Sequence, residues 1–160
     1  MKNDKSKGFT MAEVLVVLGI VGILASVTIP NWVAKYQQQV TVERLKKAYS
    51  EVQNAVRLSQ VENGDPDTWQ ITFGAKGVRT FVQTYYLPYF TGAKYSNGNS
   101  KYYVNNLHGN VTILPWCLIQ LKNGTLLSFY GEGPGSAWMY IDTNGPSGPN
   151  RAGRDIFVLN

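Results

Sequence analysis

Residues 5–30, KSKGFTMAEVLVVLGIVGILASVTIP, decide most of what this chain can be. The 21 residues 9–29 carry a single charge, which is Glu13. As a helix they would be about 30 Å long, which matches the hydrocarbon core of a bilayer. The lysines that precede the run are expected to stay in the cytoplasm, so that the rest of the chain is translocated. The sequence therefore predicts a single-pass helix with its N-terminus inside and its body outside the cytoplasm.

Glu13 separates the interpretations of this apolar run. An ionised carboxylate in an apolar environment costs on the order of several kcal/mol unless it has a partner. A cleaved secretory signal that ends near residues 24–26 would explain an apolar stretch, and so would a plain membrane anchor. Neither explains the carboxylate or the glycine that precedes Phe9.

Residues 31–63 continue the run as an amphipathic segment. No proline follows Pro30 within this segment, and the next glycine is Gly64. Apolar residues recur at spacings of three and four, as on one face of a helix; they are Val42, Leu45, Tyr49, Val52 and Val56, and Ala48 and Ala55 widen this stripe. We therefore predict one helix over residues 9–62 that is kinked at Pro30 and packs this stripe against a core.

The N-terminal residues resemble a known family. Residues 7–30, KGFTMAEVLVVLGIVGILASVTIP, are similar to the class III signal and assembly segment of type IV pilins and type II secretion pseudopilins. The likeness rests on a short basic leader, on Gly8 followed by Phe9, and on Glu13 followed by sixteen uncharged residues. It is specific over about the first thirty residues, and beyond them it concerns only the character of the helix.

The resemblance implies that a prepilin peptidase cleaves the bond between Gly8 and Phe9 and methylates the new amine of Phe9. Gly8 suits a cleavage site because a residue without a side chain lets the bond lie extended in a protease cleft. The freed ammonium of Phe9 and the carboxylate of Glu13 would pair within one subunit or between packed subunits. Pro30 takes the place of the helix-disrupting proline of the family. Phe9, Glu13 and Pro30 are thus the expected assembly residues.

Residues 64–160 are predicted to form a globular head, which gives the whole chain an α+β fold. Asn123 and Gly124 lie between two β-prone runs, as in a β-hairpin, and residues 137–141 and 156–159 supply two further strands. Apolar spacing predicts a short helix that ends before Pro88, and residues 91–101 have the composition of a loop. We expect a small antiparallel sheet of about four strands, packed on the second half of the long helix. The resemblance implies the same architecture.

The glycine-rich stretch 142–155 offers hard oxygen ligands. Asp142, Asn144 and Asp155 could hold calcium, which type II pseudopilins are known to bind in this part of the head. The spacing is not that of an EF-hand, because the twelfth position is Gly153 and not glutamate. The alternative is a long turn in which Asp and Asn side chains cap their own backbone. No other cofactor is expected.

Charge and residue usage exclude several functions. The net charge of +5 is too small to indicate nucleic-acid binding, and a single histidine and a single cysteine exclude a four-ligand N/S zinc site and an internal disulfide. Cys117 lies in a strand-like apolar run, so we expect a buried and inert thiol, and His108 gives no catalytic pair with it. The chain is therefore not predicted to be an enzyme. Many major type IV pilins close a loop with a disulfide, so the lone cysteine favours a minor pilin or a pseudopilin.

The predicted protein is a structural subunit of a type IV pilus-like or type II secretion pseudopilus filament. Its segments would be a leader (1–8), a transmembrane and assembly helix (9–30), an amphipathic continuation (31–63) and a head (64–160). Expected partners are the prepilin peptidase, other pilin or pseudopilin subunits and an inner-membrane assembly platform. The chain would begin in the bacterial inner membrane and end in a pilus or a periplasmic pseudopilus.

An alternative function is a minor pilin that binds DNA or a surface during uptake or adhesion. Its support is a loop in which charge and aromatic side chains alternate; the residues are Lys94, Tyr95, Lys101, Tyr102 and Tyr103. A solvated, tyrosine-rich loop explains the same residues without a ligand.

Overall fold

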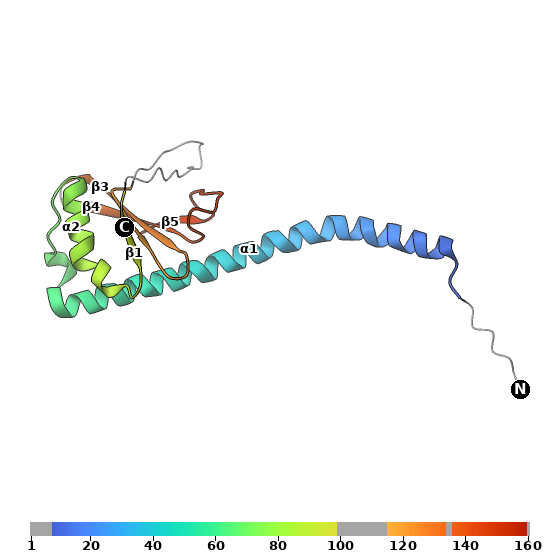
Figure 1. Ribbon diagram of the computed structural model, residues 1–160, viewed down its shortest axis with the longest axis horizontal. Helices are drawn as coiled ribbons and strands as arrows, with labels where there is room; N and C mark the ends of the chain where they lie inside the picture. The colour runs from blue at the N-terminus through green and yellow to red at the C-terminus, as the bar shows by residue number, and fades with distance from the viewer. Residues whose placement is uncertain (1–7, 99–114, 134–135, 160) are drawn as a thin grey trace, which may run out of the picture. The chain divides into compact units, whose positions relative to one another are not determined.

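The structure is a computed structural model that describes residues 8–98, 115–133 and 136–159. The chain separates into two compact units, Met1–Val40 and Thr41–Asn160. We call them the N-terminal unit and the head unit. One helix, α1 (Met11–Asn63), contributes to both units. Figure 1 shows the chain coloured along its length, with α1 running from blue into green.

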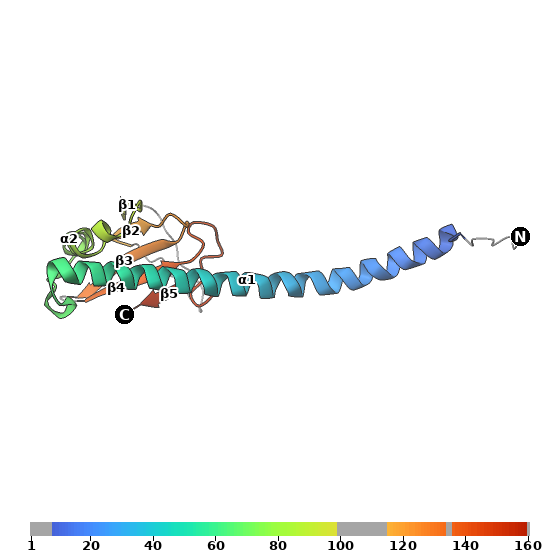
Figure 2. The same ribbon diagram turned by 90° about the horizontal axis from the view of Figure 1, so that it is seen from below.

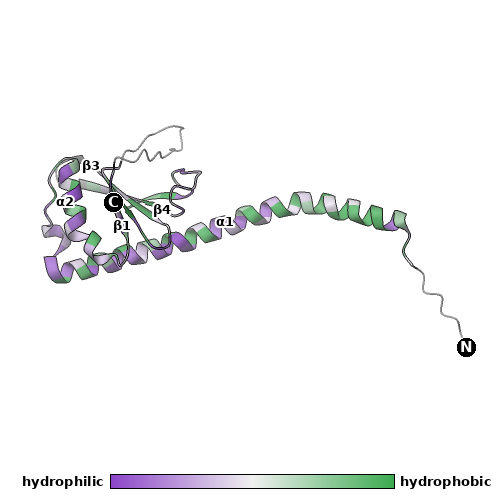
Figure 3. Cartoon of the chain, viewed as in Figure 1, coloured by the Kyte–Doolittle hydropathy of each residue, from purple (hydrophilic) through white to green (hydrophobic). Residues whose placement is uncertain are grey.

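Helix α1 is mostly apolar over its N-terminal part and mixed in character beyond it (Figure 3). It continues through Pro30, which lies inside it and does not end it. A proline deprives one carbonyl of the preceding turn of its usual N–H donor. Near this position, the Thr28 hydroxyl donates to the Leu24 carbonyl at 2.9 Å and the Asn31 amide donates to the Val27 carbonyl at 3.4 Å. The predicted long helix is therefore confirmed, with bounds shifted by one or two residues.

In its described residues, the head unit contains one further α-helix and two short 3-10 helices. These elements are η1 (Pro66–Thr68), α2 (Ala75–Tyr85) and η2 (Leu87–Tyr89). Helix α2 buries Val78 and Val82, so the predicted short helix is confirmed. A β-carbon at Gly77 would lie 1.8 Å from the carbonyl oxygen of Thr72, so the chain can pass here only with glycine at this position.

Five antiparallel strands form one sheet in the order in which they occur in the chain. They are β1 (Lys94–Asn97), β2 (Cys117–Gln120), β3 (Leu126–Gly133), β4 (Ser136–Asp142) and β5 (Ile156–Leu159). The predicted hairpin joins β2 to β3, and Gly124 adopts φ 88° in its turn. The Leu121 N–H donates to the Thr125 carbonyl at 2.9 Å and closes this turn. The α+β prediction is confirmed.

Strand β1 corrects the sequence interpretation, which assigned residues 91–101 to a loop and counted about four strands. Its four residues, KYSN, have little β propensity of their own. They pair with β2 from Lys94 opposite Gln120 to Asn97 opposite Cys117. Backbone pairing at the edge of the sheet thus overrides the local composition. The neighbouring Lys101, Tyr102 and Tyr103, like His108, lie outside the described residues.

The core of the head unit lies between one face of the sheet and the helices. Cross-strand rows such as Ile119, Leu127 and Ile141 are fully buried there. They belong to one cluster with Ala48 and Val52 of α1 and with side chains of α2. Figure 2 shows the sheet and the head segment of α1 from below. A smaller cluster of Leu118, Leu126 and Ile156 forms on strand positions that alternate with the first set.

The buried face of α1 confirms part of the predicted stripe. The buried residues are Ala48, Val52, Ala55 and Ser59. Val42 and Tyr49 of the predicted stripe are exposed. The predicted burial of Ala48, Val52 and Ala55 is therefore confirmed, and these three residues belong to the core cluster of the head unit. The predicted burial of Val42 and Tyr49 is wrong.

Candidate processing and assembly site

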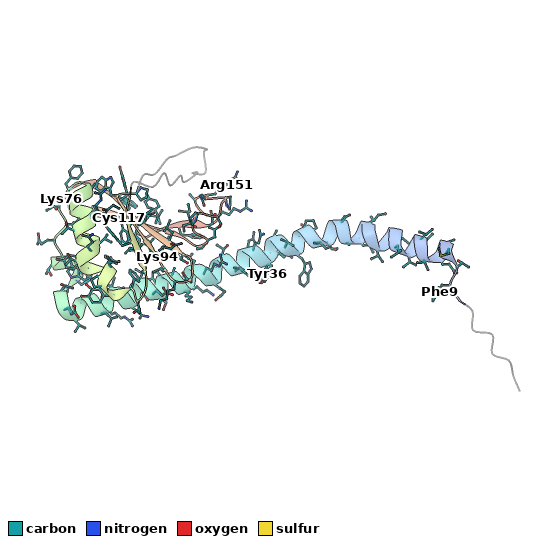
Figure 4. The ribbon with its side chains drawn as sticks, in the orientation of Figure 1. Phe9, Tyr36, Lys76, Lys94, Cys117 and Arg151 are labelled. Atoms are coloured by element: carbon teal, nitrogen blue, oxygen red, sulfur yellow. The ribbon has the colours of Figure 1, made fainter. Side chains whose placement is uncertain are left out.

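Helix α1 begins shortly after the predicted cleavage position. Residues 8–10 precede α1, and the first helical bond runs from the Val14 N–H to the Thr10 carbonyl at 3.2 Å. Thr10 is therefore the N-cap residue of the helix. Phe9 lies just outside it with 89% of its side chain exposed, at the labelled end of the chain in Figure 4.

Thr10 and Glu13 form a reciprocal capping box at this helix start. The Glu13 carboxylate accepts hydrogen bonds from the Thr10 N–H and the Thr10 hydroxyl, both at 2.8 Å. In return, the Glu13 N–H donates to the Thr10 hydroxyl oxygen at 3.2 Å. Two N–H groups that a helix start leaves unpaired are thereby satisfied. The negative charge also lies in the first turn of the helix, where the dipole stabilises it.

The capping box fixes the geometry of the residues around Glu13. The helix begins directly after Thr10, so the bond between Gly8 and Phe9 lies outside it. The capping box also gives the Glu13 carboxylate a local partner in a chain that still carries its leader. The sequence predicts that Glu13 pairs with the future Phe9 amine, and that prediction does not include Thr10. The signal was present as a threonine three residues before a glutamate at the start of an apolar run.

In the apolar run after Glu13, no other described part of the chain packs against the glycines. A β-carbon at Gly19 or Gly22 would meet no atom within 4 Å. Large apolar side chains of this run, such as Leu15 and Ile23, are exposed. By length and composition, α1 can cross a membrane, and it is the one helix of the described residues that meets this test. These features leave close-packing surfaces available to neighbouring helices.

The loop between β4 and β5 holds the predicted calcium ligands. Asp142 and Asp155 have exposed fractions of only 2% and 3%. Burial raises the pKa of Asp142 to about 7; the Asn144 N–H lowers it, and the charge of Asp155 raises it further. The Asp155 carboxylate accepts the N–H groups of Asn150 at 2.8 Å and Arg151 at 2.6 Å. This loop therefore does cap its own backbone, as the alternative reading expected.

Two amide oxygens in this loop have no donor. The Asn144 amide nitrogen donates to the carbonyls of Ser147 and Gly148, which turns its oxygen the other way. That oxygen and the amide oxygen of Asn150 are buried without a hydrogen-bond partner. Hard cations bind amide oxygens together with carboxylate oxygens, so the oxygen ligands of this loop fit calcium. Asn150 was not among the predicted ligands. The described residues contain no group of three or more His, Cys, Asp or Glu side chains that could hold a metal.

Cys117 lies in β2 within the sheet (Figure 4) and is fully buried. Burial raises the pKa of its thiol to about 12. Since the thiolate is the reactive form, this thiol is inert at neutral pH. The expectation of a buried structural cysteine is confirmed.

The comparisons with known proteins support membership in the family of type IV pilins and pseudopilins. A family model described as the prokaryotic N-terminal methylation motif matches residues 3–29. A second, described as a family of unknown function (DUF6613), matches residues 31–153. The chain belongs to the DUF6613 family, because the model of that family matches more than half of the chain.

Three similar proteins carry names from the same class. Prepilin peptidase-dependent protein D of Escherichia coli (strain K12) is 31% identical over 57% of this chain and 60% of its own length. Type II secretion system core protein G of the same organism is 28% identical over 71% of this chain and 68% of its own length. Type IV major pilin protein PilA of Myxococcus xanthus (strain DK1622) is 37% identical over 30% and 23%. The chain thus spans less than two thirds of the first relative.

No solved structure matches the chain. The relatives are named as pilus or secretion-system proteins, and at the level of the family this fits a structural role and no enzymatic one.

Proposed function

We propose that the chain is a structural subunit of a type IV pilus-like or type II secretion pseudopilus filament. It is made as a precursor, cleaved by a prepilin peptidase between Gly8 and Phe9, and N-methylated at Phe9. The observation that carries the proposal is the Thr10–Glu13 capping box, which lies directly after the cleavage position and inside the matched methylation motif.

Cleavage changes the electrostatics of the helix start. Hydrolysis of the Gly8–Phe9 bond adds water and releases the leader with a new carboxylate on Gly8. The remaining chain gains an α-amine at Phe9, which stays cationic after a single methylation. A charge in the bilayer interior costs on the order of 3 kcal/mol when it has no partner. The Phe9 ammonium therefore seeks a carboxylate, and Glu13 is the acidic residue of the apolar run.

Pairing of these charges sets the register of the filament. A subunit is stable among packed apolar helices only where its Phe9 ammonium meets a Glu13 carboxylate, its own or a neighbour's. Thr10 acts as a positioning residue, because its hydroxyl orients the carboxylate without carrying charge. The chain would be held in the inner membrane with its N-terminus inside, and an assembly platform would then move it into the filament.

The N-terminus of the processed protein tests this proposal. Mass spectrometry of protein purified from cells with a prepilin peptidase should find N-methylated phenylalanine at Phe9. Gly8→Leu is the control variant and should keep the leader, because its side chain obstructs the cleft. An intact Met1 in the wild type, or a start near residue 27, would contradict the proposal.

A second pair of variants tests Thr10. Thr10→Ala removes the cap and should lower the efficiency of filament assembly, because caps contribute about 0.5–2 kcal/mol. Thr10→Ser keeps a hydroxyl at the same place and should restore assembly. Equal assembly in both variants would show that the box has no role.

The loop between β4 and β5 is proposed as a calcium site in the same head. Asp142, Asn144, Asn150 and Asp155 would hold the ion, which supplies positive charge to two buried carboxylates. The bound calcium would stabilise the head and would take part in no chemical reaction.

The minor-pilin alternative gains no support from the described residues. Lys94 is exposed and Tyr95 is half-buried on β1, while Lys101, Tyr102 and Tyr103 lie outside the described part of the chain. Binding of DNA at low salt that is lost in a Lys94→Ala, Lys101→Ala variant would favour it.

A further inference from the structure

The head unit carries exposed charges of opposite sign at two separate places. Residues 58–75 contain three carboxylates and no lysine or arginine. We call these carboxylates, Glu62, Asp65 and Asp67, the acidic end; all three residues are exposed. They lie where α1 finishes and η1 begins.

The opposite charges come from two segments that meet in space. A β-carbon at Gly145 would lie 2.7 Å from the Gly124 carbonyl oxygen, so the loop between β4 and β5 contacts the β2–β3 turn. Three exposed cations lie on these two segments, and we call them the basic end. They are Lys122, Arg151 and Arg154. Asp142 and Asp155 in the same loop are buried, so the arginines carry its exposed charge.

These two ends lie at opposite limits of the head unit. In Figures 1 and 2 the end of α1 with η1 lies at one limit of the head along the long axis, and the loop between β4 and β5 lies at the other. Figure 4 labels Arg151 on that loop. One head therefore cannot pair its own acidic end with its own basic end. Within the described part of the chain, none of the six side chains forms an ion pair.

The acidic end is held in a defined geometry. The Tyr89 hydroxyl donates to the Glu62 carboxylate at 2.7 Å, and the Asn63 amide donates to the Tyr89 oxygen at 2.9 Å. Asp65 caps η1 by accepting the Asp67 N–H at 3.1 Å, and Pro66 fixes the backbone between them. Beside these charges, Val61 exposes 85% of its side chain. The patch therefore combines ordered carboxylates with an apolar contact.

The basic end is equally well ordered. The buried Asp155 carboxylate clamps the backbone at Asn150 and Arg151, and the Arg154 N–H donates to the Arg151 carbonyl at 3.1 Å. Lys122 lies across Gly92, where its Cε atom fills the space that a β-carbon would occupy. Charges held by a rigid backbone lose less entropy on binding, and arginine can pair with a carboxylate in a bidentate manner.

We propose that the acidic end of one head docks on the basic end of a second copy of this chain. The two surfaces differ, so the contact is heterologous, and a heterologous contact that does not close into a ring generates an open filament. The inference rests on the proposed filament function and adds a head-to-head contact to the packing of the N-terminal helices. We choose Asp67 and Arg154 as the pair to test, because both are exposed and, within the described residues, neither side chain forms a hydrogen bond that stabilises its own loop.

Cross-linking in assembled material tests this contact. Full-length protein with Asp67→Cys and Arg154→Cys is treated with a short bismaleimide; Cys117 does not react because it is buried with a pKa of about 12. The expected product is a ladder of linked chains, whereas either single cysteine variant should stay monomeric. Filaments that form but give no ladder would overturn the contact and leave the proposed function intact. If the wild type forms no filaments, both proposals fail.

Charge exchange provides an independent measurement. Asp67→Arg and Arg154→Asp alone should each lower the yield of filaments about tenfold or more, because like charges then meet at every contact. The double variant should recover most of the yield. Lys76→Glu on α2 is the control, since it reverses an exposed lysine outside the basic end, and it should keep the wild-type yield. Absence of recovery in the double variant, with both singles folded and processed, would overturn the proposal.

Discussion

The two units of the molecule treat large apolar side chains in opposite ways. In the N-terminal unit they are exposed along the whole apolar run, from Met11 to Val33. In the head unit, Leu127, Phe129 and Ile141 are buried almost completely. An exposed apolar surface of this extent marks a membrane or protein contact. The head is thus complete by itself, and the N-terminal unit is completed by its surroundings. Variants in the two units should therefore give separable effects.

The largest effect is expected from Glu13→Ala. It leaves the Phe9 ammonium unpaired among apolar helices, at a cost on the order of 3 kcal/mol, which is about a hundredfold in an equilibrium. Filament yield by electron microscopy should fall accordingly, while cleavage and the melting temperature of the head stay unchanged. Normal filaments from this variant would remove the register argument.

Leu127→Ala should produce the reverse pattern. Leu127 is fully buried in the core of the head unit, and removal of such a side chain costs about 2–5 kcal/mol of stability. Thermal unfolding followed by circular dichroism measures the loss, while processing at Gly8 continues. Leu15→Ala makes the same change at an exposed position and should leave the unfolding of the head as it is. A similar loss from both variants would contradict the division into two units.

Ala55→Leu sharpens the contrast within α1 itself. Ala55 is fully buried where the helix packs on the head, and a larger side chain there costs about 1–3 kcal/mol through overpacking. Asn54→Leu, at the adjoining exposed position, should change stability by about 0.5 kcal/mol or less. Denaturant unfolding of the two variants tests whether the face of α1 that carries Ala55 is the face packed against the core. A loss of stability in Ala55→Leu but not in Asn54→Leu is the expected result.

The smallest effect is a pH dependence confined to the head. The pKa of Asp142 is raised in the folded state to about 7 from 3.8, so the folded head binds the proton more tightly than the unfolded chain does. The stability that protonation gives is complete below about pH 4 and is lost as the pH rises through 7. The melting temperature should therefore fall between pH 5 and pH 8, and Asp142→Asn should flatten the profile.

Calcium should reverse this trend, if the loop binds it. A divalent cation favours the ionised carboxylate, so millimolar calcium should raise the melting temperature at pH 8 more than at pH 5. Magnesium is the control, because it prefers a smaller and more rigid octahedral site. An equal response to both ions, or to neither, would leave the loop as a self-capped turn.

The sequence predicted what depends on local chemistry. The helix needed only an apolar run without breakers, and the hairpin needed only Asn123 and Gly124 between β-prone segments. Strand β1 could not be predicted in this way, because its four residues become a strand through pairing with β2, which lies at least twenty residues further along the chain. Its existence is a property of the sheet and not of the segment.

The packed face of α1 shows a second limit. Apolar spacing correctly predicted the burial of Ala48, Val52 and Ala55, but it also included Val42 and Tyr49, which are exposed. It missed the buried Ser59, because a polar residue does not contribute to an apolar pattern. At the candidate site, Glu13 was identified as half of a pair, and the partner already present in the precursor, Thr10, was readable from a known capping pattern but overlooked.

The bonds between Thr10 and Glu13 also bear on the storage of the precursor. A copy that still carries its leader has no free amine at Phe9, and its carboxylate already receives two hydrogen bonds. Such a copy has no ammonium to pair with a neighbour's carboxylate, and its own carboxylate is already hydrogen-bonded. Uncut chains would therefore accumulate in the bilayer without premature polymerisation. Proteolysis would then do more than trim the chain: it would create a positive charge at Phe9 that the Glu13 carboxylate of the same or a neighbouring subunit can balance.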